Sequence, residues 1–253
     1  MASKHIHIVF AHPNHGSFNG RMLDVAIETL TSLGHVVTVS DLCEMGFNPV
    51  IGKEDFRGHD PQEDVTREQK KLALADLVIF QFPLYTLGYP AILKGYFDRV
   101  MTEGYSFELP SKIYDDALLK GKRAVLSFTT GSKRDYYGEK GIMGDINVIL
   151  WPLQNGGLRF NGFDVLAPNV VYGLDAHLDS QKALDVWRRR LERIFDEQPL
   201  LFHRNTDFVD NKLKDEVVEE MKGSYSRTVG QHCGKSLPPG SQTDVVCREE
   251  TDK

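Results

Sequence analysis

The sequence predicts an α/β protein with a doubly wound parallel sheet of five strands. Apolar strand-like runs alternate with amphipathic helix-like segments through the first two hundred residues, the order expected of a parallel sheet with helices on both faces. The run at 77–80 is continuously apolar, which is typical of a strand buried on both faces. Loops of small and polar residues follow several of these runs, where open α/β sheets bind ligands.

The first strand is expected at 6–11, where the sequence reads IHIVFA. A helix should follow over 17–33, because Met22, Val25, Ala26 and Leu30 recur on one helical face. Gly34 is expected to end this helix, and the apolar residues 36–39 form the second strand. Residues 43–64 mix glycines, prolines and charges, which indicates a long irregular connection.

A helix over 65–75 leads into the third strand at 77–80, which polar Gln81 and Pro83 are expected to end. Pro90 suits the first turn of the next helix, which should run to Val100. A fourth strand at 123–128, a helix at 144–153, a fifth strand at 163–166 and a charged helix at 180–195 complete the pattern. Five strands in this arrangement indicate a flavodoxin-like sheet.

Composition excludes several classes of function. The chain has 253 residues, a net charge of -6 and no basic run, so nucleic-acid binding has little electrostatic support. No apolar run reaches the length of a membrane span, and the first residues lack the apolar core of a signal peptide. Three well-separated cysteines indicate reduced thiols. We therefore expect a soluble, cytoplasmic protein that binds neither nucleic acid nor membranes.

The domain division is expected near residue 200. Residues 1–200 form the flavodoxin-like domain, whereas the tail from Gln198 onward has few large apolar side chains. A helical stripe of Val209, Leu213, Val217 and Met221 predicts that the region 201–253 docks on the main domain or on a partner subunit. The last dozen residues are expected to be frayed.

Three loops are candidate ligand sites. The loop from His12 to Asn19 joins a strand to a helix start, where backbone N–H groups favour an anion such as a phosphate. The alternative is a simple helix entry that Ser17 caps. The loop Leu84-Tyr85-Thr86-Leu87-Gly88, after Pro83, is flat and partly aromatic. A third loop, Thr129-Thr130-Gly131-Ser132, offers hydroxyl and N–H groups, although such a sequence alone is often only a turn.

Together these loops suit a flat ring with a phosphate tail, which describes a flavin. A flavin supplies redox chemistry that the protein only has to orient and tune. Tyr137 lies just beyond the third loop and could donate to a flavin carbonyl as negative charge grows there, although it could equally be a surface tyrosine. Histidine and cysteine spacings predict no metal site, and the motifs of P-loop, Rossmann and serine-hydrolase proteins are missing.

Longer motifs make the chain resemble the NAD(P)H:quinone oxidoreductase (DT-diaphorase) family, and most closely its longer vertebrate-type member. These motifs are AH with SFN at 11–12 and 17–19, SDL with FNP at 40–42 and 47–49, EQKK with ADLVIFQFPL at 68–84, PAILKG at 90–95, AVLS with TTG at 124–131, and GD with NVILWP at 144–152. The tail segment HCGKSLP is similar to the ending of that member.

This resemblance implies two-electron reduction of quinones by NADH or NADPH through a bound FAD, in a homodimer with active sites between subunits. NAD(P)H would reduce the flavin and leave before the quinone binds in its place. The resemblance makes Tyr137 the catalytic tyrosine. The FAD-binding positions are His12, Ser17, Phe18, Asn19, Pro83, Leu84, Tyr85, Thr86, Leu87, Thr129, Thr130, Gly131, Ser132 and Tyr137, and the substrate positions are Ser106, Phe107, Glu108, Met143 and Phe160.

Several departures from the family lie close to this site. Met143 replaces a histidine that partners the catalytic tyrosine, and methionine can neither donate nor carry charge. Thr86 and Leu87 replace an aromatic pair, and Leu109 replaces a tyrosine. The connection at 59–63 is shorter, and a gap at Ala176 and His177 affects a pocket histidine. The alternatives are a quinone reductase that prefers a nicotinamide riboside donor, and a non-catalytic flavodoxin-like carrier or regulatory subunit.

Overall fold

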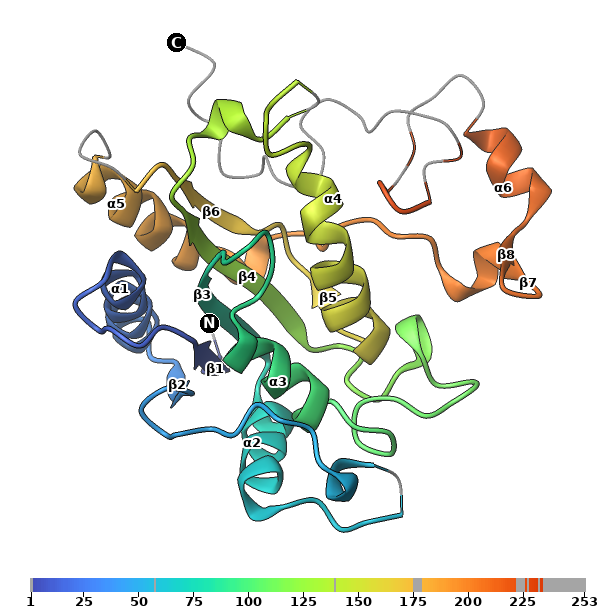
Figure 1. The fold of residues 1–253 in the computed structure, drawn as a ribbon, viewed down its shortest axis with the longest axis horizontal. Helices are drawn as coiled ribbons and strands as arrows, with labels where there is room; N and C mark the ends of the chain where they lie inside the picture. Colours follow the sequence, from blue (N-terminus) through green and yellow to red (C-terminus); the bar gives the residue numbers. More distant parts are fainter. Residues whose placement is uncertain are drawn as a thin grey trace.

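A twisted parallel sheet with helices on both faces organises the protein (Figure 1). The computed structural model describes residues 2–56, 58–138, 140–174, 179–221, 226, 228–231 and 233. The strands are β1 (His5–Phe10), β2 (Val36–Asp41), β3 (Leu77–Pro83), β4 (Arg123–Thr130), β5 (Asp164–Val165) and β6 (Asn169–Tyr172). Their order is β2-β1-β3-β4-β5, every pair is parallel, and β6 also pairs with β4. The predicted flavodoxin-like fold class is confirmed.

The fifth position of the sheet is shared by two short strands. β5 pairs with the amino end of β4, where Arg123 faces Asp164, and β6 pairs with its carboxyl end, where Thr130 faces Tyr172. The sequence predicts only the first of these strands. Pro168 lies between them and has no N–H for the ladder, which explains why one strand position is occupied by two segments.

Two hydrophobic clusters lie on opposite faces of the sheet. One face is covered by α1 (Phe18–Ser32) and α5 (Ser180–Leu191), through Met22, Leu30 and Trp187 among others. The other face is covered by α2 (Glu63–Leu74), α3 (Ala91–Val100) and α4 (Ile146–Trp151), and α4 continues as a π-helix, Pro152–Leu158. The two faces explain why β3 is buried along its whole length.

Strands β3 and β4 are longer than the sequence predicts. β3 passes through Gln81 and ends at Pro83, because the buried amide of Gln81 has hydrogen-bond partners within the protein. β4 includes Thr129 and Thr130, which were expected in a loop. Both strands therefore carry their polar residues to the carboxyl edge of the sheet as parts of the ladder, where regular backbone geometry fixes their positions.

The tail continues along the main domain and then forms a small hairpin. The N–H of Leu200 donates to Val165 O at 2.8 Å, and the Arg159 guanidinium donates to the carbonyl of His203. β7 (Phe208–Val209) and β8 (Lys212–Leu213) pair antiparallel, and α6 (Asp215–Glu220) follows. The division at residue 200 stays a prediction, and the final dozen residues lie outside the described part.

The expected helical stripe through Val209 and Leu213 is wrong, because both residues lie in the hairpin strands. The two residues between these strands, Asp210 and Asn211, have φ values of 48° and 61°. Asp and Asn tolerate this left-handed conformation, which a two-residue hairpin loop requires. In the described ranges, no helix is long and apolar enough to cross a membrane.

Candidate ligand site at the carboxyl edge of the sheet

Three predicted loops meet where β1, β3 and β4 end, and buried amides join them. The Asn19 side-chain amide donates to Thr129 Oγ1 at 2.8 Å, and Gln81 donates to the Asn19 amide oxygen at 2.7 Å. All three side chains are buried. The backbone N–H of Leu84 also donates to Thr129 O at 2.8 Å. Asn19, Gln81 and Thr129 thus join the start of α1 to the ends of both strands in one hydrogen-bonded layer, which we call the floor of the site.

Above this floor, the loop after β3 is a tight turn. Tyr85 and Gly88 exchange two backbone hydrogen bonds, at 3.2 and 2.9 Å. Between them, Thr86 and Leu87 have φ values of 49° and 57°, a left-handed conformation that non-glycine residues rarely adopt. The side chains of Tyr85, Thr86 and Leu87 are exposed, so a flat ligand or a partner chain can contact them.

The loop after β1 begins α1 through a side-chain cap. Ser17 Oγ accepts the N–H of Gly20 at 3.2 Å, which is the cap that the alternative of a simple helix entry predicts. The N–H of Gly16 donates to Asn14 Oδ1 at 2.8 Å, and the N–H of Ser17 donates to Asn14 O at 3.1 Å. The N–H groups of Gly16 and Ser17 therefore have partners within the loop. An anion would have to bind the backbone N–H groups of the residues that follow.

Phe18 and Asn19 are those residues, the first two of α1, and the first N–H groups of a helix have no partner within it. His12 lies beside them on the same loop. Burial lowers the pKa of His12, and its Nδ1 accepts the N–H of Asn14 at 3.0 Å. The neutral ring therefore holds its proton on Nε2, which can donate. These donors suit the phosphate end of a nucleotide-like ligand.

The loop after β4 brings a phenol to the same edge. Tyr137 Oη lies 2.6 Å from Thr130 Oγ1, and the ring of Tyr137 packs 5.5 Å from that of Tyr172. Thr130 Oγ1 also accepts the N–H of Ser132 at 3.3 Å. With that bond accepted, Thr130 can donate to Tyr137, which leaves the phenol proton of Tyr137 for a ligand. Met143 lies in the same loop, where its N–H donates to Tyr136 O.

Two predicted substrate residues lie at the opposite edge of the sheet. Phe107 and Phe160 pack together, with ring centroids 5.1 Å apart. Phe160 lies four residues before Asp164, which pairs with the first residue of β4, whereas Tyr137 contacts Thr130, its last residue. An eight-residue strand is about 25 Å long. A single chain therefore does not bring these two phenylalanines and the phenol of Tyr137 into one site.

A cavity of 540 Å³ opens beside these two rings, between α3 and the π-helix. Phe97, Met101, Leu153, Phe107 and Phe160 are among its lining residues, which makes it mainly apolar. Such a volume lies within the range of small-molecule pockets. Gly88 and Tyr89, which follow β3, also line it, so the cavity extends from the turn after β3 to the aromatic pair and is a second candidate contact surface.

The other predicted substrate residues are engaged locally. Ser106 is buried, and its hydroxyl donates to Thr102 O at 3.3 Å. Glu108 pairs with Lys112 at 2.8 Å. Their contact with substrate stays a prediction. Ala176 and His177 lie outside the described residues.

Sequence reasoning missed Gln81 and Tyr172 as parts of the site. Gln81 had a detectable signal, because it is a polar residue inside an otherwise apolar buried strand. Tyr172 had no such signal, since it belongs to β6, which was not predicted.

The fold defines a flavodoxin-like protein, with a candidate ligand site at the carboxyl edge of its sheet. A family model described as flavodoxin-like fold matches residues 4–194. NAD(P)H dehydrogenase (quinone) 1 of Rattus norvegicus is 41% identical, with 96% of this chain and 98% of the relative covered. The chain therefore belongs to the NAD(P)H:quinone oxidoreductase family.

Two further proteins extend the comparison. Ribosyldihydronicotinamide dehydrogenase (quinone) of Mus musculus is 43% identical to this chain. The alignment includes 79% of this chain and 96% of the mouse protein. A solved structure of a candidate quinone reductase from Klebsiella pneumoniae is 32% identical, with a TM-score of 0.79 and with 85% of this chain and 95% of that chain covered. The alignment with the rat protein thus includes more of this chain than the alignment with the mouse protein.

Proposed function

We propose that this protein is a flavin-dependent NAD(P)H dehydrogenase that reduces quinones to hydroquinones. The observation that carries this function is the hydrogen-bonded pair of Tyr137 and Thr130, 2.6 Å apart, at the carboxyl edge of a flavodoxin-like sheet. The pair lies on a floor tied together by Asn19, Gln81 and Thr129. Rigid donors at a ligand edge suit a reaction in which negative charge grows on a bound ring.

The residues present fit a flavin. The exposed turn at Thr86 and Leu87 offers a surface for the ring system, and the segment 129–132, at the end of β4, offers hydroxyl and backbone groups. His12 Nε2 and the N–H groups of Phe18 and Asn19 suit the phosphate tail. We propose FAD as the particular flavin, as in the family this chain resembles.

A bound flavin supplies hydride transfer from NAD(P)H to the quinone in two half-reactions. The protein's part is to bind, orient and donate. Thr130 Oγ1 accepts the N–H of Ser132 and shares a hydrogen bond with the phenol of Tyr137. When Thr130 is the donor in that bond, the phenol proton of Tyr137 is available to the ligand without a partner at Met143.

We further propose a homodimer in which each active site lies between subunits. Its main support is that Phe107 and Phe160 lie at the opposite edge of the sheet from Tyr137. A two-fold partner could bring its own pair of phenylalanines to the Tyr137 site, as isologous dimers do when a site is incomplete in one chain.

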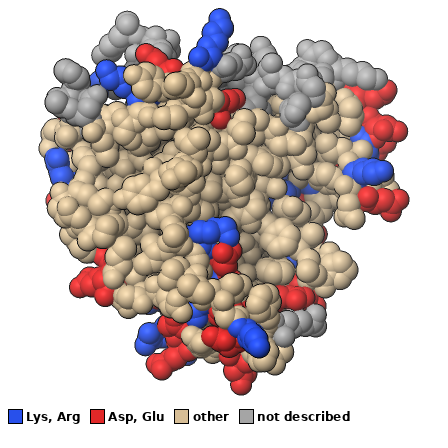
Figure 2. Space-filling model, in the orientation of Figure 1, with Lys and Arg blue, Asp and Glu red and all other residues tan. Residues whose placement is uncertain are grey.

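The surface supports the same assembly. Figure 2 shows few charged side chains on the face over α3 and α4, whereas charges gather toward its lower end. Large apolar side chains are also exposed on α4 and on the loops that follow β3 and β4: Tyr85, Leu87, Tyr136, Ile142 and Val148. Exposed apolar side chains next to a candidate ligand site suit contact with a partner chain.

The test is steady-state oxidation of NADH and NADPH by flavin-loaded protein with a simple naphthoquinone as acceptor. We expect quinone-dependent oxidation. Flavin binding without quinone-dependent oxidation would instead identify a non-catalytic carrier. Heating the protein and separating the released chromophore identifies FAD or FMN, and gel filtration with light scattering measures the mass of the assembly. FMN as the sole chromophore would refute FAD, and a monomer active by itself would refute the shared site.

A second donor deserves testing because of one comparison. The mouse relative, 43% identical, is named for a ribosyldihydronicotinamide substrate. The same assay should therefore compare NADH, NADPH and N-ribosyldihydronicotinamide. We expect NADH or NADPH to serve as donor, in line with the rat relative, which aligns with 96% of this chain. The cytoplasm is the compartment that suits this chemistry, because it supplies NAD(P)H, and the described cysteines, Cys43 and Cys233, are free thiols.

A further inference from the structure

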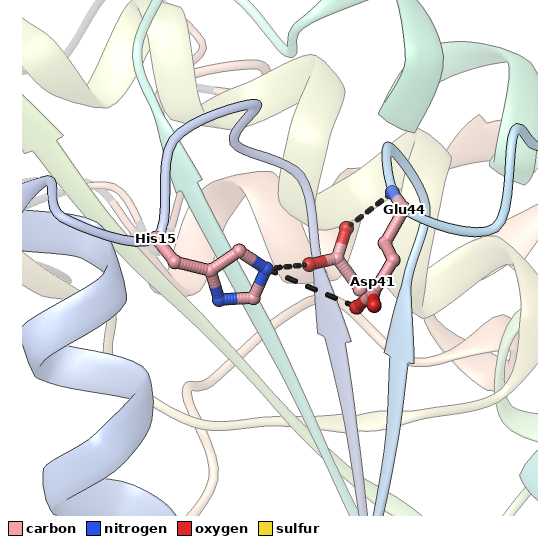
Figure 3. A group of neighbouring side chains, drawn as sticks. All are labelled: His15, Asp41 and Glu44. Carbon is pink, nitrogen blue, oxygen red and sulfur yellow. Dashed lines mark hydrogen bonds and ion pairs between the residues drawn. The ribbon is translucent and has the colours of Figure 1, made fainter.

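A cluster of His15, Asp41 and Glu44 lies beside the carboxyl edge, apart from the residues assigned to the flavin. His15 belongs to the loop after β1, Asp41 is the last residue of β2, and Glu44 lies in the turn that follows. His15 Nε2 is 2.6 Å from Asp41 Oδ2 and 4.0 Å from Glu44 Oε2. Figure 3 shows the imidazole directed from its loop toward both carboxylates.

Asp41 is the fixed member of this cluster. Its residue surface is only 8% exposed. Asp41 Oδ1 accepts the backbone N–H groups of Cys43 at 3.0 Å and of Glu44 at 2.9 Å, which orients the carboxylate. Asp41 Oδ2 is also buried, yet it accepts no hydrogen bond and faces His15. A buried carboxylate oxygen without a hydrogen bond is costly unless a cation compensates for it.

We infer that His15, Asp41 and Glu44 bind a divalent transition-metal ion of the Zn²⁺ type. One imidazole nitrogen and two carboxylate oxygens, with a water in the fourth position, form a ligand set that such ions accept. Donor and acceptor atoms of the three side chains lie within 4.8 Å of one another, and the described site is empty of any ion.

The geometry needs only small side-chain movements. Ligands about 2.1 Å from a tetrahedral ion lie about 3.4 Å from one another. The observed separations of 2.6 Å and 4.0 Å lie on either side of this value, so the His15 ring must move away from Asp41 and toward Glu44. The side chains of His15 and Glu44 are 59% and 78% exposed, which leaves both free to rotate, while Asp41 stays in place.

The competing explanation is an ion pair between a protonated His15 and Asp41. Such a pair would not need Glu44, whereas a three-ligand site does. The sequence does not predict this site, because His15 is far along the chain from Asp41 and Glu44, and the pairing of β1 with β2 brings them together. An ion held there would tie the loop 12–16, beside the proposed phosphate site, to the end of β2.

The test is calorimetric titration of Zn²⁺ into flavin-loaded protein that has been freed of metal with a chelator. We expect one strong site in the wild-type chain, weakened at least tenfold in both His15→Ala and Glu44→Gln. His59→Ala and Glu63→Gln are matched controls, because they remove an exposed histidine and an exposed glutamate elsewhere. Flavin absorbance and far-UV circular dichroism identify any variant that fails to fold.

Thermal unfolding gives a second readout. Zn²⁺ should raise the Tm of the wild-type chain and of both controls, but not that of the His15 and Glu44 variants, because a ligand stabilises only the state that binds it. Wild-type protein without a strong Zn²⁺ site would overturn the inference. So would loss of binding in His15→Ala alone, with Glu44→Gln unchanged, or equal binding by all variants. None of these outcomes depends on quinone reductase activity.

Discussion

Glu68 is a buried carboxylate whose replacement should strongly destabilise the fold. It lies on α2, is fully buried, and accepts hydrogen bonds from Ser40 at 2.6 Å and from Lys71 at 2.6 Å. Tyr96 Oη lies 3.3 Å and His7 Nε2 3.6 Å from it. Glu68→Gln keeps the shape of the side chain but removes its charge, and places an amide against groups that need an acceptor.

The magnitude follows from the proton affinity of this carboxylate. Burial alone would raise the pKa of Glu68, but its interactions with His7, Lys71 and Ser40 outweigh burial and lower it from 4.5 to about 2. A tenfold change in proton affinity corresponds to about 1.4 kcal/mol, so the ionised form contributes about 3 kcal/mol at neutral pH. Because the pKa is lower in the folded state, this stabilisation is present above pH 4.5 and is lost as the pH falls toward 2.

Urea denaturation of flavin-loaded wild-type and Glu68→Gln protein measures this contribution at pH 7 and at intervals down to pH 3. We expect a loss of about 3 kcal/mol at pH 7 that shrinks steadily below pH 4.5. Glu63→Gln on the same helix is the control, because the Glu63 side chain is 88% exposed, and it should change stability by less than about 0.5 kcal/mol. A loss below 1 kcal/mol at pH 7, or one independent of pH, would refute the reasoning.

Three further predictions concern catalysis. Tyr137→Phe should slow flavin reduction about tenfold in stopped-flow measurements, because one hydrogen bond to developing charge is lost. The control Tyr136→Phe, at an exposed tyrosine, should leave the rate unchanged. Equal rates for wild type and Tyr137→Phe would show that the phenol has no role. Met143→His should change that rate less than about threefold, because Thr130 already partners Tyr137; a larger gain would show that a histidine relay matters. When Tyr137→Phe subunits and Phe160→Ala subunits are mixed and reassembled, activity should partly return. In each mixed dimer, one of the two sites combines an intact Tyr137 from one subunit with an intact Phe160 from the other. No recovery of activity would contradict shared sites.

The meeting of the three loops could be predicted from the sequence, because the carboxyl ends of parallel strands lie at one edge. The contacts within it could not. Gln81 was expected to end its strand because it is polar, yet its amide is satisfied by Asn19 inside the protein. The hydrogen bond between Thr130 and Tyr137 depends on how an irregular loop folds back, which no periodicity encodes. Neither Thr86 nor Leu87 suggests a left-handed turn, since glycine or asparagine usually marks one.

That turn has an energetic consequence. Non-glycine residues in left-handed conformations cost of order 1–3 kcal/mol each, so the surrounding strand ends must hold Thr86 and Leu87 in place. An Asn-Gly pair would form the same turn without this cost but would remove the two side chains from the surface. The loop therefore gives up local stability to present a hydroxyl and an isobutyl group there. Replacing Thr86 and Leu87 would therefore change two properties at once: the turn would become more stable, and the surface available to a ligand would change.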